Sequence, residues 1–107
     1  MHVSADIQLI PIGVGESLSA SIAAAIRAIE ARGLAPRTHA HGTSVEGDLS
    51  VVLAAIEDAI TAVHAAGAPR VSTAVKISSR TDRAQSDAEK VASVERHLGR
   101  GKSSPGA

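Results

Sequence analysis

Apolar and polar residues alternate along two stretches of the chain. In HVSADIQLI, residues 2–10, every second residue is apolar, which is typical of a strand with one buried side. The same period recurs in RVSTAVKIS, residues 70–78, whose inner face would consist of Val71, Thr73, Val75 and Ile77. The alternation therefore predicts two half-buried strands, the first of which ends at the turn sequence PIGVGE.

Two other stretches have the apolar spacing of an amphipathic helix. The first helix is predicted to begin after Ser17, which can serve as the N-cap, and to end near Gly33. The second helix is predicted to be capped by Asp48 or Ser50 and to stop at Gly67. The apolar stripes are Leu18, Ile22, Ile26 and Ile29 in the first helix, and Leu49, Val52, Leu53, Ile56, Ile60 and Val63 in the second.

Two weaker strands are predicted between these helices, and a third helix after the last strand. The stretch LAPRTHAH, residues 34–41, contains Pro36, which has no N–H for a ladder, so we place this strand at a sheet edge. GTSVEG, residues 42–47, predicts a turn and a short strand that could form a hairpin with it. A capping box of Ser86 and Glu89 begins the third helix, whose apolar positions are Val91, Val94 and Leu98.

The resulting element order is β-α-β-β-α-β-α. This order predicts an α+β protein with the ferredoxin-like, split β-α-β arrangement and an extra C-terminal helix. Right-handed crossovers would place the first two helices on one face of the sheet. With 107 residues the chain is long enough for one domain, which we assign to residues 1–99, with residues 100–107 as a flexible tail.

Composition excludes several classes of function. No aromatic residue is present, and 11 basic residues balance 11 acidic ones, so neither base stacking nor a basic surface favours nucleic-acid binding. Without cysteine there is no disulfide framework and no thiolate metal site. The N-terminal sequence lacks the features of a signal peptide, and no segment is apolar enough to span a membrane. We expect a soluble cytoplasmic domain with no membrane partner.

The sheet face opposite the helices is predicted to be polar and rich in small side chains. Strand parity assigns to it His2, Ser4, Asp6, Gln8, Arg37, His39, His41, Ser44, Glu46, Ser72, Ala74 and Lys76. Solvated sheet faces more often have long charged residues and threonine. A small and polar face suits a subunit contact or a recessed ligand site, and a plain solvated face remains the alternative.

Three kinds of chemistry are relevant to these residues. His39 and His41 share a strand face, with Glu46 across the turn, but a good fourth ligand is absent, so we expect no metal site. Gly13 and Gly15 precede a helix and could hold an anion, although turn geometry explains both more simply. No serine has a nucleophile-elbow context, and no acid–base spacing is recognisable, so we expect neither enzymatic activity nor a cofactor.

Several motifs in order resemble the small thiamine-binding proteins of ferredoxin-like fold. The resemblance covers the chain from Val3 to about Leu98, and its most specific parts are PIG at residues 11–13, GTSVEGD at residues 42–48, and VSTAVKI followed by Arg80 and Asp82. It implies non-enzymatic binding of thiamine or its hydroxymethylpyrimidine part, and assembly through the sheets into dimers and often tetramers. Family members often have an apolar residue at the position of His41, and acidic residues at those of Ser78 and Ser79.

A thiamine-like ligand requires particular side chains in its site. Thiamine has a cationic thiazolium ring and an aminopyrimidine that presents a donor beside an acceptor, so a site needs a carboxylate and a few hydroxyl groups. The candidate ligand-binding residues are Asp6, Ser17, Thr43, Ser44 and Glu46. Asp48 is assigned as a helix cap. Two other hypotheses stay open: a structural or regulatory oligomer without a small-molecule ligand, and an enzyme that acts on a small metabolite.

Overall fold

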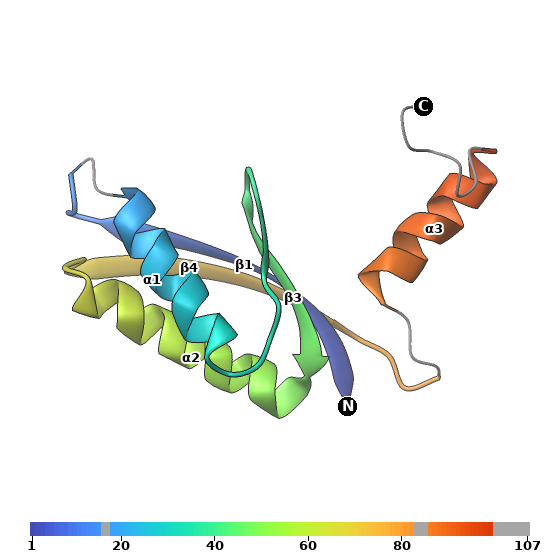
Figure 1. Ribbon diagram of the computed structural model, residues 1–107, viewed down its shortest axis with the longest axis horizontal. Helices are drawn as coiled ribbons and strands as arrows, with labels where there is room; N and C mark the ends of the chain where they lie inside the picture. Colours follow the sequence, from blue (N-terminus) through green and yellow to red (C-terminus); the bar gives the residue numbers. More distant parts are fainter. Residues whose placement is uncertain (16–17, 83–85, 100–107) are drawn as a thin grey trace.

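The computed structural model describes residues 1–15, 18–82 and 86–99. Within these ranges the chain forms an α+β fold whose elements follow the predicted order (Figure 1). The strands are β1 (His2–Ile12), β2 (Arg37–His39), β3 (Gly42–Asp48) and β4 (Arg70–Ser79), and the helices are α1 (Leu18–Glu30), α2 (Leu49–Ala65) and α3 (Asp87–His97). Ser17 and the predicted tail, residues 100–107, lie outside the described residues.

The four strands form one antiparallel sheet in the order β2-β3-β1-β4. Strand β3 lies between β1 and β2, and β1 lies between β3 and β4, so each helical crossover spans a strand of opposite direction. As Pro36 predicted, β2 is an edge strand. It is limited to three residues, however, whereas we had predicted a strand over residues 34–41.

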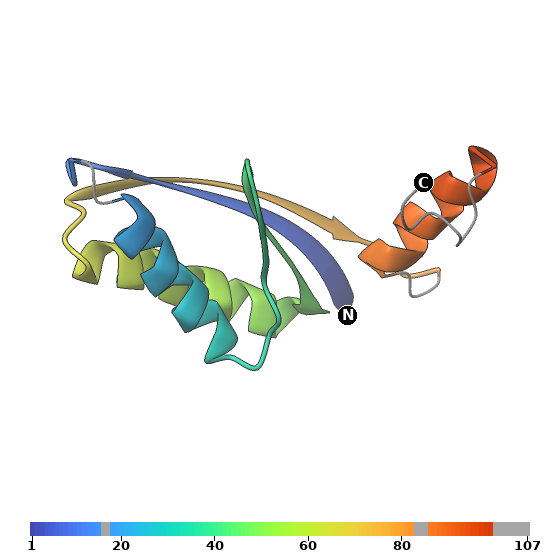
Figure 2. The same ribbon diagram turned by 45° about the horizontal axis from the view of Figure 1, so that its top comes forward.

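The helices α1 and α2 lie together on one face of the sheet, and the core fills the space between (Figure 2). Val3, Ala5 and Ile7 point into this layer and are at most 2% exposed, which confirms the predicted alternation. Because no aromatic side chain is available, the core is built from valine, isoleucine and alanine. Buried alanines such as Ala55 and Ala59 let the backbones approach closely.

One position of the predicted α2 stripe was wrong. Leu53 is 49% exposed, whereas Val52 and Val63 are fully buried. The buried residues of α2 also include Ala55 and Ala59. At about 100° per residue, Leu53 points roughly 100° away from the centre of that face, so alanine occupies the place we gave to leucine.

Strand β1 continues through Pro11 to Ile12, although we predicted that it ends before the PIG sequence. Pairing with β3 extends only as far as Ile7, so the last residues of β1 have a neighbour on one side alone. A proline is tolerated in a strand that has such an open edge. The strand ends at Gly13, whose φ of +87° suits glycine.

Strand β4 departs from its predicted burial. Val75 and Ile77 face the helix side, as the register with Ile7 and Ala5 requires, but they are 39% and 38% exposed. Because β4 is the outer strand on its side of the sheet, no further strand screens these side chains from solvent.

Helix α3 stands apart from the helical layer, near the end of the sheet where the N-terminus lies (Figures 1 and 2). Its predicted N-cap is confirmed, since the hydroxyl of Ser86 accepts a hydrogen bond from the backbone N–H of Glu89 at 3.1 Å. The carboxylate of Glu89 lies 3.3 Å from the same hydroxyl. None of its described residues is buried. The Cα radius of gyration is 15.8 Å, against about 13 Å for a compact domain of this length.

No helix within the described ranges combines the length and the apolar character needed to cross a bilayer.

Candidate functional site

The register of the sheet places a row of polar residues across the face that α1 and α2 leave open. Arg37 lies beside Ser44, Ser44 beside Asp6, and Asp6 beside Lys76. The backbone N–H of His41 donates to Nδ1 of His39 at 3.3 Å, so the ring proton is on Nε2, 3.1 Å from Oδ1 of Asp6. The predicted polarity of this face is therefore confirmed.

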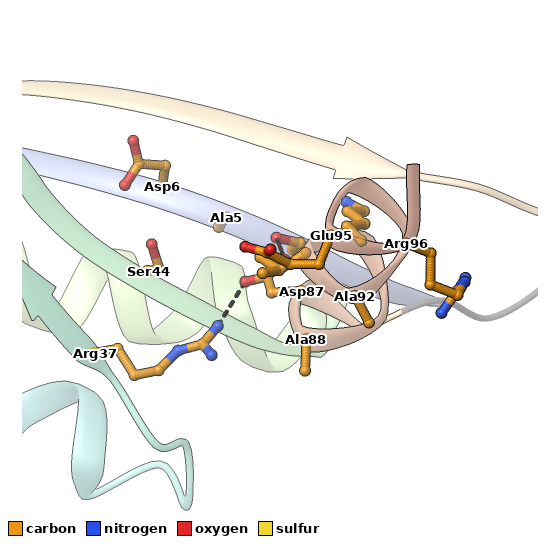
Figure 3. A pocket seen from close by; sticks show the side chains of 12 residues that line it. Ala5, Asp6, Arg37, Ser44, Asp87, Ala88, Ala92, Glu95 and Arg96 are labelled. Carbon is orange, nitrogen blue, oxygen red and sulfur yellow. Dashed lines mark hydrogen bonds and ion pairs between the residues drawn. The ribbon is translucent and has the colours of Figure 1, made fainter. Parts of the chain in front are cut away.

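A wide hollow of about 1120 Å³ lies between this face and α3, and we call it the open-face groove. Figure 3 shows sheet residues on one side of it and α3 residues on the other. Its lining residues include Ser4, Asp6, Arg37 and Ser44 from the sheet, and Asp87, Val91, Glu95 and Arg96 from α3.

Asp87 anchors the start of α3 to the sheet through both its side chain and its backbone. Its carboxylate accepts from Oγ of Ser4 and from Nη2 of Arg37, both at 2.7 Å (Figure 3). Its backbone N–H donates to Oε1 of Glu46 at 3.2 Å. An acidic residue at a helix N-terminus is also favoured by the helix dipole. The position of α3 thus depends on a polar anchor at one end.

Glu46 lies within this anchor and does not line the groove. Its carboxylate is 3.4 Å from Nη2 of Arg37 and 3.3 Å from Nε2 of His2, and its side chain is 22% exposed. Sequence reasoning proposed Glu46 as a ligand contact because it pointed to the open face. The structure confirms that orientation, and it assigns the carboxylate oxygens to partners within the chain.

A second hollow, of about 300 Å³, lies on the opposite side of the sheet, and we call it the helix-side pocket. One wall is the apolar side of α1, another is the second half of β1, and the third is the β2–β3 hairpin. The lining residues include Ile7, Leu9, Leu18, Ile22, Ile26, Thr38, His39, His41 and Thr43. A small, mostly apolar hollow with a few polar groups is the usual form of a small-molecule site.

Thr43 is the most deeply placed polar residue of this pocket. It is 7% exposed, points to the helix side like Val45, and lies beside Ile7 and Thr38 in the sheet. In the described part of the chain its hydroxyl group has no hydrogen-bond partner. The hydroxyl oxygen is not among the fully buried side-chain atoms that lack a partner, so it stays open to the pocket and is available to a ligand.

The two glycines of GTSVEGD are explained by close packing. A Cβ atom on Gly42 would lie 2.7 Å from the carbonyl oxygen of Ile7, and one on Gly47 would lie 2.7 Å from Cδ2 of Leu34. Glycine therefore lets the hairpin approach β1 at one end and lets Leu34 cover the strand at the other. The motif shapes one wall of the helix-side pocket through its backbone.

The predicted site residues are divided between the two sides of the sheet. Asp6 and Ser44 line the open-face groove, and Glu46 lies beside it in the anchor of α3. Thr43 lines the helix-side pocket instead, and Ser17 is outside the described residues. The alternation of the strand already implied this division. Val45 was predicted to point to the helices, and Thr43, two residues before it, must point the same way. The sequence did not indicate that α1 forms a wall of the pocket. Leu18, Ile22 and Ile26 have the spacing of ordinary core residues.

Among the described residues, His39, His41 and Glu46 do not form a metal site. His39 pairs with Asp6, whereas Glu46 is in contact with His2 and Arg37. Across the ranges that the structure describes, no group of three metal-ligating side chains is found.

Asp48 is the N-cap of α2, which confirms one of the two predicted caps, Asp48 and Ser50. Its carboxylate accepts from Oγ of Ser50 at 2.6 Å, from the N-terminal amino group at 3.1 Å and from the backbone N–H of Ser50 at 3.2 Å. These contacts, the Ser50 hydroxyl first, lower the pKa of Asp48 to about 2. The two contacts with Ser50 belong to the cap, and the third is an ion pair with the N-terminal amino group.

Known proteins resemble the chain over most of its length. The UPF0045 protein sll0230 of Synechocystis is 43% identical over 98 residues, which are 92% of this chain and 81% of that one. The crystal structure of a hypothetical protein, MJ1052, from Methanocaldococcus jannaschii has 31% identity and a TM-score of 0.77, covering 92% of this chain and 97% of that one.

A more distant structure has the same fold. It is a putative thiamine biosynthesis/salvage protein from Thermotoga maritima, with 20% identity and a TM-score of 0.75 over 88% of this chain and 99% of that one. The family model described as thiamine-binding protein matches residues 5–95, which include the whole lining of the helix-side pocket and most of that of the open-face groove. The resemblance read from the motifs is confirmed, and the chain belongs to the thiamine-binding protein family, UPF0045.

Proposed function

We propose that this protein binds thiamine or a related hydroxymethylpyrimidine compound without converting it, as a carrier or sensor within a homo-oligomer. Membership of the thiamine-binding family supports the ligand class. The strand order β2-β3-β1-β4, with two split β-α-β units, supports the ferredoxin-like class for the fold.

The observation that supports a specific site is the hydroxyl of Thr43 in the helix-side pocket, on a residue that is 7% exposed and whose side chain makes no hydrogen bond to the described part of the chain. In our proposal the flat pyrimidine ring lies between the apolar wall of α1 and β1. The hydroxyl of Thr43 makes a hydrogen bond with a ring nitrogen or the amino group. The volume of about 300 Å³ is at the lower end of the range for small-molecule pockets, which suits one or two small rings.

Asp6 is proposed to supply the negative charge for the thiazolium ring. Its carboxylate is held by His39, a lining residue of the pocket, and lies 3.5 Å from the position of a Cβ atom on Gly42. It is 53% exposed, so a cation at the mouth of the pocket would be attracted without the full desolvation of both charges.

The open-face groove is the competing site for the same ligand. Asp6, Asp87 and Glu95 line it, together with the hydroxyl of Ser44, so a cation would find carboxylates there. Its volume of about 1120 Å³ exceeds the usual range for one small ligand. Arg37 also neutralises part of the charge of Asp87. We therefore favour the helix-side pocket and reserve the groove for contact between copies of the chain.

Neighbouring residues on β3 provide a matched test of the two sites. Thr43→Val keeps the shape of the side chain and removes its hydroxyl, and Ser44→Ala removes the adjacent hydroxyl on the opposite face. Isothermal titration with thiamine and with hydroxymethylpyrimidine should show affinity about two- to twelvefold lower for Thr43→Val, because one neutral hydrogen bond is worth about 0.5–1.5 kcal/mol. Ser44→Ala should bind like the parent.

The other results of that titration are equally informative. Weakened binding by Ser44→Ala alone would move the ligand to the open-face groove. Absence of binding heat with either compound in the parent protein would favour the structural or regulatory oligomer. Mass spectrometry of the ligand after incubation addresses enzymatic activity, and we expect thiamine to be recovered unchanged.

A further inference from the structure

The ring of His39 joins two strands beside the helix-side pocket. Its Nε2 lies 3.1 Å from Oδ1 of Asp6 on β1, and its own strand, β2, belongs to the hairpin that forms one wall of the pocket. In the described ranges of the chain, no other side chain makes a hydrogen bond or an ion pair with Asp6. The orientation of the Asp6 carboxylate therefore depends on His39.

The backbone of the hairpin turn fixes the charge state of this ring. The N–H of His41 donates to Nδ1 of His39, so Nδ1 is an acceptor and the ring proton is on Nε2, directed to Asp6. An imidazole with one acceptor nitrogen is neutral. The pair of His39 and Asp6 therefore retains the full negative charge of the carboxylate, and a thiazolium ring at the mouth of the pocket would be attracted by it.

The other charged groups around this pair come from the neighbouring strands and the turn. On β2, Arg37 points to the same face but is engaged by the carboxylates of the α3 anchor. On β4, Lys76 lies beside Asp6 in the sheet register, and the β3 residues next to the pair are uncharged. His41 lines the pocket from the turn, and α1 contributes only apolar side chains to it. The local negative charge therefore depends chiefly on Asp6 and on the protonation of His39.

We propose that His39 is a positioning residue that gives the helix-side pocket its preference for a cationic ligand, and that protonation of its ring abolishes this preference. The inference rests on the proposed function and adds the regulation of that site by pH. Neutral His39 holds the carboxylate of Asp6 in place and leaves its charge to the ligand. Protonated His39 forms an ion pair with Asp6, so the attraction for the thiazolium ring is largely cancelled.

Protonation of His39 also disturbs the hairpin wall of the pocket. A protonated imidazole is a donor at both nitrogens, so Nδ1–H would face the N–H of His41 and their hydrogen bond would be lost. The turn has little space to move toward β1, because a Cβ atom on Gly42 would lie 2.7 Å from the carbonyl oxygen of Ile7. The turn must therefore move outward. Acid should open the mouth of the pocket as it cancels the charge.

The variant His39→Gln separates the two roles of the ring. The amide of glutamine can donate to Asp6 in place of Nε2 but cannot gain a charge. Thiamine is titrated into both proteins at about pH 8 and about pH 5.5, near the two ends of the range in which histidine usually changes its charge. Near pH 8 the variant should bind within about twofold of the parent. Near pH 5.5 the parent should bind about two- to fivefold more weakly than the variant, as expected for a partly exposed ion pair.

Each comparison is made at a single pH, so any protonation of the aminopyrimidine ring affects parent and variant alike. His97→Gln is the matched control, because this ring lies on α3, contacts the carbonyl oxygen of Ser93 at 2.8 Å and lines neither hollow. It should bind like the parent at both pH values. His39→Ala cannot donate to Asp6, so its affinity should be about two- to fivefold below that of the parent near pH 8. Parental affinity of His39→Ala there would overturn the positioning role.

The titrations distinguish failure of this inference from failure of the proposed function. Equal affinities of the parent and His39→Gln at both pH values would overturn the inference and leave the proposed function intact. Absence of thiamine binding by the parent at either pH would overturn both.

A measurement without ligand tests the coupling between the ring and the turn. The amide NMR signal of His41 should shift further between about pH 8 and about pH 5.5 in the parent than in His39→Gln, because only the parent loses the hydrogen bond to Nδ1 when the ring is protonated. Equal shifts in the two proteins would overturn the inference.

Discussion

Helices α2 and α3 have similar sequence signals and opposite environments. Each begins at a side-chain cap, Asp48 or Ser86, and each has apolar residues at helical spacing. In α2 five residues are buried, Val52 and Val63 completely, whereas α3 has no buried residue in the described chain. The comparison shows that an apolar stripe predicts a partner surface and leaves open whether that surface belongs to the same chain.

The largest expected contrast comes from the same substitution in both helices. Val63→Ala should lower the free energy of unfolding by about 2 kcal/mol, because it removes buried methyl groups and leaves a cavity. Val94→Ala should change it by less than about 0.5 kcal/mol at protein concentrations where the chain is monomeric. Urea unfolding of both variants measures the difference. Similar losses for the two would mean that α3 packs on its own chain.

A smaller effect is expected from the anchor of α3. Glu46→Gln weakens the contacts with Arg37 and with the backbone N–H of Asp87, so α3 should detach more often. Hydrogen exchange in residues 87–97 should become about five times faster, a change of about 1 kcal/mol that is typical of partly exposed charged contacts.

The same variant also tests the earlier expectation for this residue. If Glu46 acts through α3 alone, thiamine affinity should change by less than about threefold. A loss of tenfold or more with normal exchange in α3 would return Glu46 to the ligand site, as its sequence position suggested.

The smallest effect is the pH dependence of the α2 cap. The pKa of Asp48 is lowered in the folded chain to about 2, below its ordinary value of about 3.9, so its contribution to stability is present above pH 4. That contribution is lost as the pH falls toward 2. Melting temperatures between pH 2 and 5 should fall less steeply for Asp48→Asn, which also caps helices. If the melting temperatures of parent and variant fall equally with pH, Asp48 does not contribute to the loss of stability in acid.

Much of the fold could be predicted because local signals agreed with the tertiary structure. Alternation identified β1 and β4, caps identified α2 and α3, and Pro36 placed β2 at an edge. The errors arose where a neighbour decides the outcome. Pro11 is acceptable in β1 only because the pairing of β1 with β3 ends at Ile7. On α2, alanines occupy the core positions, and Leu53 is exposed.

The candidate site was less predictable than the fold. Residue chemistry grouped Thr43 with Ser44, but adjacent residues of a strand point to opposite faces, and the structure separates them. The partners of Glu46 could not be inferred, since Asp87 is 41 residues away in the sequence. The α1 residues that line the helix-side pocket were interpreted as core residues. Apolar residues have the same helical spacing whether they fill a core or line a pocket.

The location of α3 after the core has a consequence for synthesis of the chain. The fully buried core residues lie between Val3 and Ala68, and β4 completes the sheet by Ser79. A nascent chain can therefore close its core before the residues of α3 have been added. The residues that form the core are therefore made first, and the exposed apolar residues of α3 are added only after the sheet can be complete.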